Sequence, residues 1–401
     1  MISLAGRDML HSWGKFVFTG LGLGLLIGVT FIMAGVFRGM VDDGQVLLDN
    51  SGADLWVVQK DTLGPYAEPS SLADDWYRAL ATLPGVAKAT NVTYLTMQLQ
   101  QGERDVRALV VGVVPGAAWD EVGRPPQLVA GRHVMRSHYE AVADLATGFQ
   151  LGDRIRIRRQ TFTVVGLTRR MVSSGGDPMV FIALKDAQQA QFLKDNEAIW
   201  QGRRRNEASP VFNRPAVPGL LEAVNQAQVT SNSVNAVLLR LAPHADPDQV
   251  AREIRRWQRL TVYTRAEMQE ILVGKLIANS AKQIGMFLAI LALVSAAIVA
   301  FIIYTLTMDK IREIAVLKLI GTRNRTIAGM ILQQALLLGI VGFGVGKVTA
   351  TLAAPAFPKY VLLLPQDAVT GFLAILAICA LASVVAIRLA LRVDPAEAIG
   401  G

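Results

Sequence analysis

The hydrophobic residues gather in four segments that contain no charged side chain. These segments lie between Lys15 and Arg38, Lys282 and Asp309, Arg325 and Lys347, and Asp367 and Arg388. Each is long enough to cross the hydrocarbon core of a bilayer as a helix, which needs about 20 apolar residues. We therefore predict membrane-spanning helices at residues 16–38, 282–308, 326–353 and 367–391. The first exceeds the apolar part of a secretory signal and lacks a small-residue cleavage site at Phe37–Gly39, so we expect it to be retained.

Residues 39–281, between the first two predicted spans, show strand and helix patterns in turn. Ala53–Gln59, Thr93–Gln100 and Val106–Val114 read as strands, and Leu72–Leu83 reads as a helix capped by Ser71 and Asp74. Near the far end, Val234–Leu241 alternates as a strand. A helix then starts at Asp246 and Pro247, and a short strand follows at Leu260–Tyr263. We expect residues 39–117 and 231–281 to form one membrane-proximal α/β lobe.

The remaining residues, 118–230, are expected to form an inserted β-rich lobe. Leu151–Asp153 turns into a hairpin of Arg154–Arg158 and Phe162–Leu167, and Met179–Leu184 adds a strand, which suggests a small barrel or sandwich. From Glu197 to Asn232 no period is visible, so we predict a long loop. Arg203–Arg205 lie within it, and a solvated surface is favoured there over an acidic partner.

Two helices are predicted to continue from the membrane into this domain. Thr264 and Glu267 have the spacing of a capping box, and helical pattern then runs from Ala266 through Ala281 into the second span. Residues 39–49 extend the first span in the same way. Such stalks are stiff enough to transmit motion.

The composition agrees with this segregation of polar and apolar parts. The chain of 401 residues is 52% hydrophobic and 18% charged, which is too apolar for a soluble protein and too charged for one buried throughout in lipid. The predicted fold class is a membrane α-helical protein with four transmembrane helices and a large α+β extracytoplasmic domain inserted between helices 1 and 2.

The basic residues of the short loops predict the orientation. Residues 309–325 contain Lys310, Arg312, Lys318, Arg323 and Arg325, whereas residues 354–366 contain one basic residue, Lys359. By the positive-inside rule the first loop is cytoplasmic, as are the terminal segments 1–15 and 392–401, and residues 39–281 and 354–366 lie outside.

Several other functions are disfavoured by the same residues. The net charge of +8 is dispersed or used for membrane orientation, so nucleic-acid binding is not expected. The four histidines have no metal-ligand spacing, and Asp74 with Asp75 fits a helix start better than an acid–base pair. Gly346–Lys347 lacks the flanking residues of a phosphate loop, and Lys347 is expected to snorkel to the outer interface. No metal, catalytic residue or cofactor is predicted in this chain.

Small residues recur at helix-packing spacing in two of the spans. Gly20, Gly24 and Gly28 share one face of the first span, and Gly342 and Gly346 repeat the spacing in the third. Such residues permit close helix contact. The spacing leaves open whether that contact forms within one subunit or across a dimer.

The loop at 309–325 carries a helical pattern of its own. Ile311, Ile314, Ala315 and Lys318 fall on one stripe, and Gly321 is suited to end the helix. From the residues alone, positive-inside anchoring is favoured over a docking function.

The order of residues in this loop favours a docking function over anchoring. Arg312-Glu313-Ile314-Ala315-Val316-Leu317-Lys318, followed by Gly321 and Arg323-Asn324-Arg325, resembles the signature loop of the MacB- and FtsX-like ABC permeases, the type VII or mechanotransmission class. The order of spans and the tail Asp394–Ala398 are also similar to that family. Gly52–Val58, Leu151–Asp153 and Phe162–Gly166 resemble its DevC-like exporters in particular.

The resemblance implies a permease subunit of the bacterial inner (cytoplasmic) membrane that is not itself an enzyme. A separate cytoplasmic ABC ATPase subunit would bind ATP and Mg²⁺ and dock on a coupling helix, and a second copy of the chain would complete the transporter. Export would use a periplasmic adaptor (membrane fusion protein) and an outer-membrane channel. The coupling residues implied are Lys310, Arg312, Glu313, Ile314, Leu317, Lys318 and Gly321.

Two related functions remain as alternatives. A lipoprotein-releasing permease would take its cargo from the membrane, and an FtsX-like regulator of cell-wall hydrolases would use the same machinery without transport. The size of the inserted lobe disfavours the regulator. Genes encoding an adaptor, a lipoprotein chaperone or a hydrolase beside this one would separate the three.

Overall fold

The computed structural model describes residues 13–102, 104–116, 122–192, 196–211, 218–229, 232–357 and 359–392. The chain divides into a membrane unit, residues 1–40 and 279–401, and an α+β unit, residues 41–278. The predicted tail motif Asp394–Ala398 and most of the N-terminal segment lie outside the described residues.

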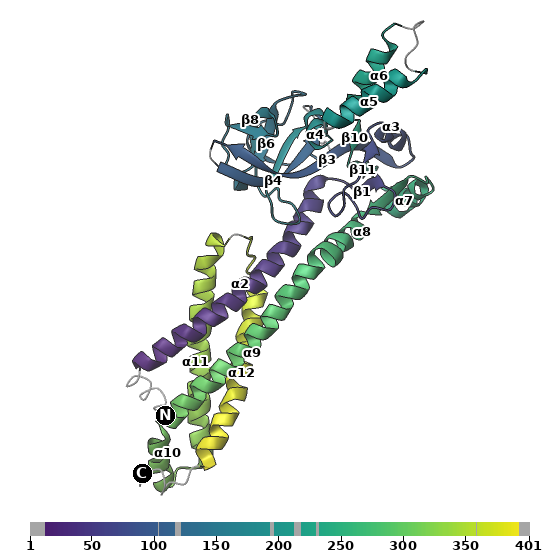
Figure 1. The fold of residues 1–401 in the computed structure, drawn as a ribbon. Coiled ribbons are helices and arrows are strands. Elements are labelled where there is room, and N and C mark those ends of the chain that lie inside the picture. The colour runs from purple at the N-terminus through teal and green to yellow at the C-terminus, as the bar shows by residue number, and fades with distance from the viewer. Residues whose placement is uncertain are drawn as a thin grey trace. The chain divides into compact units, whose positions relative to one another are not determined.

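The membrane unit is built from long apolar helices. These are α2 (Trp13–Ser51), whose first part belongs to this unit, α9 (Ala278–Asp309), α11 (Asn324–Ala353) and α12 (Pro365–Arg392), with the short α10 (Ile311–Leu319) between α9 and α11 (Figure 1). Among the described residues, four segments are long and apolar enough to span a membrane: Phe18–Ser51, Ser280–Asp309, Asn324–Ala356 and Pro365–Leu391. This confirms the predicted fold class. Leu23, Ile27 and Phe31 of α2 belong to the buried core of this unit with residues of the other three helices.

The first sheet of the α+β unit joins the two ends of the inserted domain. β1 (Leu55–Gln59), β3 (Val86–Gln101), β11 (Ala236–Leu241) and β12 (Leu260–Thr264) pair antiparallel in the order β12-β1-β11-β3. Leu55 aligns with both Leu239 and Thr264. Apolar side chains of this sheet pack on α7 (Pro247–Arg255), where Val250 and Ile254 are buried. Strands from the two ends of the inserted domain therefore meet in one sheet.

The long strand β3 is also part of a small barrel. β3 pairs with β4 (Arg104–Val113), β4 runs parallel to β9 (Met179–Ala183), and β9 pairs with β6 (Glu140–Asp144). β6 runs parallel to β8 (Gln160–Thr168), β8 pairs with β7 (Arg154–Ile157), and β7 returns to β3 at Gln100. These six strands close a ring around a core that includes Val110, Val180 and Phe162, and β5 (Leu128–Gly131) extends the sheet beyond β8. A barrel is present as predicted, but β4, which the sequence placed in the membrane-proximal lobe 39–117, belongs to it, and β3 is shared with the first sheet.

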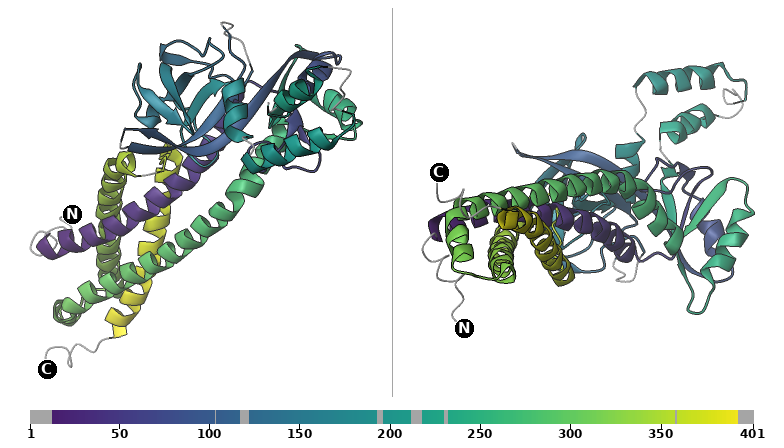
Figure 2. Two further views of the ribbon diagram at one scale, coloured as in Figure 1. Left: turned by 45° about the horizontal axis from the view of Figure 1, so that its top comes forward. Right: turned by 90° about the horizontal axis from the view of Figure 1, so that it is seen from below.

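Residues 197–232, predicted as a long loop, contain two helices instead. α5 (Asn196–Ala208) and α6 (Leu220–Val229) lie side by side as a hairpin (Figure 2). Asn206 donates to the side-chain oxygen of Asn225 at 2.8 Å across the pair. Arginine, glutamine, glutamate and alanine have high helix propensity, and here propensity outweighs the absence of a clear hydrophobic period.

The predicted helix at Leu72–Leu83 is also wrong in its first half. Leu72 and Ala73 form β2, which pairs with β10 (Ser233–Val234), and the helix α3 covers Trp76–Ala81. The backbone N–H of Ser71 donates to the side chain of Gln59 at 3.2 Å, and the helix N-cap is Asp75, which makes no side-chain capping bond. Because Leu72 and Ala73 pair with β10 in an extended conformation, the helix begins only at Trp76.

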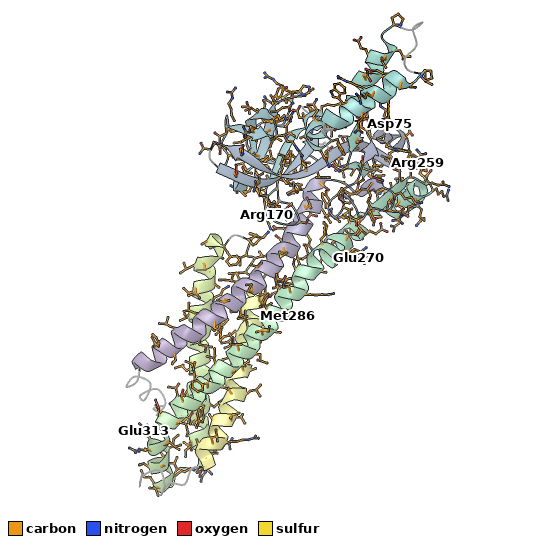
Figure 3. The ribbon with its side chains drawn as sticks, viewed as in Figure 1. Asp75, Arg170, Arg259, Glu270, Met286 and Glu313 are labelled. Carbon is orange, nitrogen blue, oxygen red and sulfur yellow. The ribbon has the colours of Figure 1, made fainter. Side chains whose placement is uncertain are left out.

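The end of the α+β unit leads into the second span through a changed helical geometry. α8 (Arg265–Glu270) is followed by the π-helix η2 (Ile271–Ile277) and then by α9. The predicted continuous helix therefore contains a wider turn, which sequence periodicity does not reveal. Nearby, Arg170 and Arg265 form ion pairs with Asp42 and Asp49 of α2, and Figure 3 shows Arg170 beside that helix.

The capping box at the start of α8 gives a direct stability prediction. The Thr264 hydroxyl accepts from Glu267 N–H at 3.4 Å, and the Glu267 carboxylate accepts from Thr264 N–H at 2.9 Å. Thr264→Ala should lower the free energy of unfolding by about 1 kcal/mol, because one helix N–H loses its acceptor. Denaturant unfolding of the full chain in detergent measures the change. Thr264→Ser retains the hydroxyl and should restore most of the loss; an equal loss in both variants would contradict the capping explanation.

Candidate functional site

The short helix α10 is defined at both ends by local backbone bonds. Ile314 N–H donates to Lys310 C=O at 3.0 Å in its first turn. At its other end Gly321 has φ +89°, Gly321 N–H donates to Lys318 C=O at 3.0 Å, and Thr322 N–H donates to Leu317 C=O at 3.0 Å. This is the Schellman arrangement, in which glycine adopts the left-handed conformation and satisfies the last carbonyls. Gly321 therefore ends the helix, as its sequence position predicts.

One face of α10 is fixed to the membrane unit. Ile314 and Ala315 are 2% and 1% exposed, and Ile314 lies in the same buried cluster as Ile327 and Ile331 of α11. The ammonium group of Lys318 donates to the carbonyl oxygen of Leu391 at 2.8 Å, in the last turn of α12. A cation at that position also interacts favourably with the negative end of the helix dipole. These contacts hold α10 in place on the helices around it.

The opposite face of α10 is exposed and apolar. Val316, Leu319 and Ile320 are 46%, 63% and 76% exposed, and they follow Asp309, outside the four apolar spans. Basic residues adjoin them, since Arg323 and Arg325 are exposed at the start of α11. Exposed apolar side chains with a charged rim, outside the lipid-spanning segments, are typical of a protein–protein contact. We call Val316, Leu319 and Ile320 the α10 outer patch.

The residues predicted for coupling divide between the two faces. Arg312 and Glu313 are exposed, and Figure 3 shows Glu313 on α10. Ile314 is buried inside the membrane unit, Lys310 and Leu317 are half-buried, and Lys318 bonds to α12. Sequence reasoning missed the outer patch itself. The signal was present, because Val316, Leu319 and Ile320 are apolar residues that fall off the stripe of Ile311, Ile314, Ala315 and Lys318.

The predicted glycine faces meet within one chain. A Cβ atom built on Gly24 of α2 would lie 2.5 Å from the Cβ of Val345 and 3.0 Å from the carbonyl oxygen of Gly342, both on α11. On α11, a Cβ atom at Gly346 would lie 2.8 Å from the carbonyl oxygen of Gly24. Cβ atoms at Gly20 and Gly28 would likewise lie 3.0 Å or less from side-chain atoms of α11. The first and third spans are therefore in backbone-to-backbone contact.

Fold and helix order together define a class: a multi-pass membrane protein with a large α+β domain inserted after its first span. Residues 16–257 match the family model of the MacB-like periplasmic core domain. Residues 285–395 match that of the FtsX-like permease C-terminal domain. The chain belongs to the MacB/FtsX-like family of ABC transporter permeases.

Relatives of similar length support this assignment. The chain is 24% identical over 405 aligned residues to the uncharacterized ABC transporter permease Rv0072 of Mycobacterium tuberculosis strain H37Rv, with 100% of each chain covered. It is 23% identical, with the same coverage, to the uncharacterized ABC transporter permease Rv2563 of that strain.

Two solved structures are similar at low identity. The periplasmic region of MacB from Actinobacillus actinomycetemcomitans is 11% identical with a TM-score of 0.34 and covers 57% of this chain and 97% of its own. The extracellular domain of the noncanonic ABC-type transporter YknZ from Gram-positive bacteria is 11% identical with a TM-score of 0.32 and covers 53% of this chain and 99% of its own.

Proposed function

We propose that α10 is the coupling helix on which a separate ABC ATPase subunit docks, and that this ATPase binds ATP and Mg²⁺. The observation that carries the proposal is the outer patch of Val316, Leu319 and Ile320, exposed on a helix whose other face is buried in the membrane unit. A patch held in this way transfers movement of a partner to the spans, because its helix cannot turn without disturbing the buried contacts of Ile314 and Ala315.

The orientation proposed from the sequence is compatible with this docking. The basic residues at 309–325 favour the cytoplasmic side for α10, where ATP is available. Both chain termini would then be cytoplasmic, and the α+β unit would lie in the periplasm of a cell with an inner membrane. The same orientation leaves Lys359, in the loop between the third and fourth spans, on the outer side.

A second copy of the chain is proposed to complete the transporter. The close-packing glycines of α2 and α11 are used within one chain, so they do not supply the dimer contact. Of the apolar stretch of the second span, 17% is buried within the chain, whereas the corresponding share is 44% in the first span, 33% in the third and 22% in the fourth. The exposed side chains of α9, among them Phe287, Ile290 and Leu293, are therefore the surface we assign to the second copy.

The proposed activity is export driven by a mechanical cycle. ATP binding would bring two ATPase subunits and their coupling helices together, and α2 and α9 would carry the movement to the α+β unit. A periplasmic adaptor would receive the cargo. The adaptor rests on the resemblance of Gly52–Val58 and Leu151–Asp153 to DevC-like exporters.

A charge placed in the outer patch tests the docking proposal. Leu319→Asp combined with Ile320→Asp should reduce copurification with the partner ABC ATPase, and stimulation of that ATPase in nanodiscs, by at least about tenfold. A desolvated, unpaired carboxylate costs several kcal/mol at an apolar contact.

The matched control is Val129→Asp, at an exposed apolar residue of β5 in the α+β unit with 49% exposure. It should leave assembly and stimulation unchanged. If the α10 variant assembled and stimulated as the wild type does, α10 would serve only as an anchor. Thermal midpoints of both variants show whether the fold is retained.

A further inference from the structure

A cavity of about 420 Å³ lies inside the α+β unit, away from α10. It is bounded by Leu47 near the end of α2, the loop 65–69, Tyr94–Thr96 of β3, the loop 173–177 and Gln191 at the end of α4 (Leu184–Gln191). A narrower recess that shares Leu47, Tyr66 and Tyr94 continues toward Met179 and Phe181. Sites for small ligands are concave, partly apolar and carry a few placed polar groups, and this cavity is of that kind.

One wall is a rigid aromatic pair. The rings of Tyr66 and Tyr94 pack edge to face with centroids 4.9 Å apart, and their hydroxyl oxygens lie 3.2 Å apart. The indole N–H of the fully buried Trp56 donates to the Tyr66 oxygen at 3.2 Å. Asn235 holds the strand behind them, because its side-chain oxygen accepts from Tyr94 N–H at 2.8 Å. This wall is formed before any ligand arrives.

The charged side chains among the described lining residues are two carboxylates, Glu68 and Asp177. Ser173 shapes the loop that presents Asp177, since its hydroxyl accepts from Gly175 N–H at 3.2 Å and Asp177 N–H at 3.0 Å. Arg107 reaches Asp177 at 3.3 Å, but its side chain is 68% exposed, so this pair is screened by solvent. Burial raises the pKa of both phenols, so Tyr66 and Tyr94 remain neutral and the two carboxylates are the negative charges on the described lining. The cavity therefore combines an aromatic wall with two carboxylates on its lining.

We propose that this cavity binds a small organic cation, with its ammonium group toward Glu68 and Asp177 and its apolar body against Leu47 and the two tyrosine rings. Carboxylates and tyrosine faces both attract an organic ammonium group. An anion would meet repulsion from both carboxylates. At about 30 Å³ per water-sized group, the volume suits a ligand of about a dozen non-hydrogen atoms.

Direct binding to the full chain in phosphatidylcholine nanodiscs tests the proposal, with no ATPase present. The probe is phenethyltrimethylammonium, compared by calorimetry with neutral 2-phenylethanol and anionic 3-phenylpropionate. We expect saturable binding of one cation per chain, weaker binding of the alcohol and none of the anion. Absence of saturable cation binding, or equal affinity for the anion, would overturn the proposal. Because no ATPase takes part, this result is independent of the docking function of α10.

Three variants locate the site. Asp177→Asn should weaken cation binding about tenfold, whereas Asp105→Asn, an exposed carboxylate of β4, should change it less than about twofold. Gly175→Trp should abolish binding sterically. A Cβ atom at Gly175 would lie 3.6 Å from the Ser173 hydroxyl and 3.8 Å from an Asp177 carboxylate oxygen, so the position accepts a side chain that points at the site. If Asp177→Asn failed to fold, Gly175→Trp would still test the site. Unchanged cation affinity in a folded Gly175→Trp protein would show that the cation does not bind in this cavity.

Discussion

Replacing Gly24 with leucine is expected to prevent the membrane unit from folding stably. Even the first added carbon would lie 2.5 Å from the Cβ of Val345 and 3.0 Å from the Gly342 carbonyl oxygen. Neither group can move aside, since both belong to the neighbouring helix at the point of closest approach. Overpacking in a close-packed interior typically costs about 1–3 kcal/mol, and a clash with backbone lies at the upper end. Yield of folded protein and its thermal midpoint in detergent measure the effect.

A control for this prediction lies two residues away on the same helix. A Cβ atom at Gly22 meets no described atom within 4 Å, so Gly22→Leu should be tolerated and should add an apolar side chain to a span. Gly344 and Gly346 form the corresponding pair on α11, with open space at Gly344 and the Gly24 carbonyl oxygen 2.8 Å from a Cβ at Gly346. Equal losses at Gly22 and Gly24 would show that glycine flexibility, not close contact, is what α2 requires.

Replacing Glu140 with alanine is expected to cost the α+β unit about 3 kcal/mol of stability. The side chain is 5% exposed, and its carboxylate accepts from Arg132 at 2.5 and 2.9 Å and from the backbone N–H groups of Met135 and Arg136, both at 3.0 Å. Removal would leave two backbone N–H groups without their acceptor, and it would also break the ion pair to Arg132, whose own side chain is 44% exposed. Denaturant unfolding of the full chain at neutral pH measures the loss. Asp105→Ala, at an exposed position of β4, should change stability by less than about 0.5 kcal/mol.

The same variant should show a characteristic pH dependence. Hydrogen bonds from Arg132 lower the pKa of Glu140 from 4.5 to about 2, followed in importance by the opposing effect of burial and by the two backbone N–H groups. Because the pKa is lower in the folded state, the stabilisation is fully present above pH 4.5 and is lost as the pH falls toward about 2. The stability difference between wild type and Glu140→Ala should therefore narrow over that range. A difference that is constant with pH would exclude the ionised carboxylate as its source.

The sequence predicts the membrane unit better than the α+β unit, for a physical reason. A span must be apolar over its whole length, so charges such as Lys282 and Asp309 mark its ends. Gly321 and the caps at Asp246 and Thr264 were also predictable, because each acts on backbone groups a few residues away. One element that depends on distant pairing, β2, was missed. Leu72 and Ala73 read as helix until Ser233 and Val234 are placed beside them.

The candidate site was predictable in the same local sense. The stripe of Ile311, Ile314, Ala315 and Lys318 identified the inner face of α10, but not that Lys318 bonds to Leu391, a residue on another helix. The glycine spacings of the first and third spans indicated close contact, yet only the structure shows that the two faces belong to one chain. The cavity of the α+β unit collects side chains from segments far apart in the chain, and no local pattern could have predicted it.

Strand β3 has a mechanical consequence for the α+β unit. It pairs with β11 over Val86–Val92 and with β4 over Thr93–Gln101, so one unbroken backbone serves both the first sheet and the barrel. A load taken up by the barrel reaches the first sheet through covalent bonds, with no flexible joint to absorb it. The two lobes thus act as one lever arm. A chimaera in which residues 118–230 come from a relative would have to re-form the ladder between β4 and β9. The α5–α6 hairpin takes no part in these ladders, so it can be exchanged without breaking strand pairing.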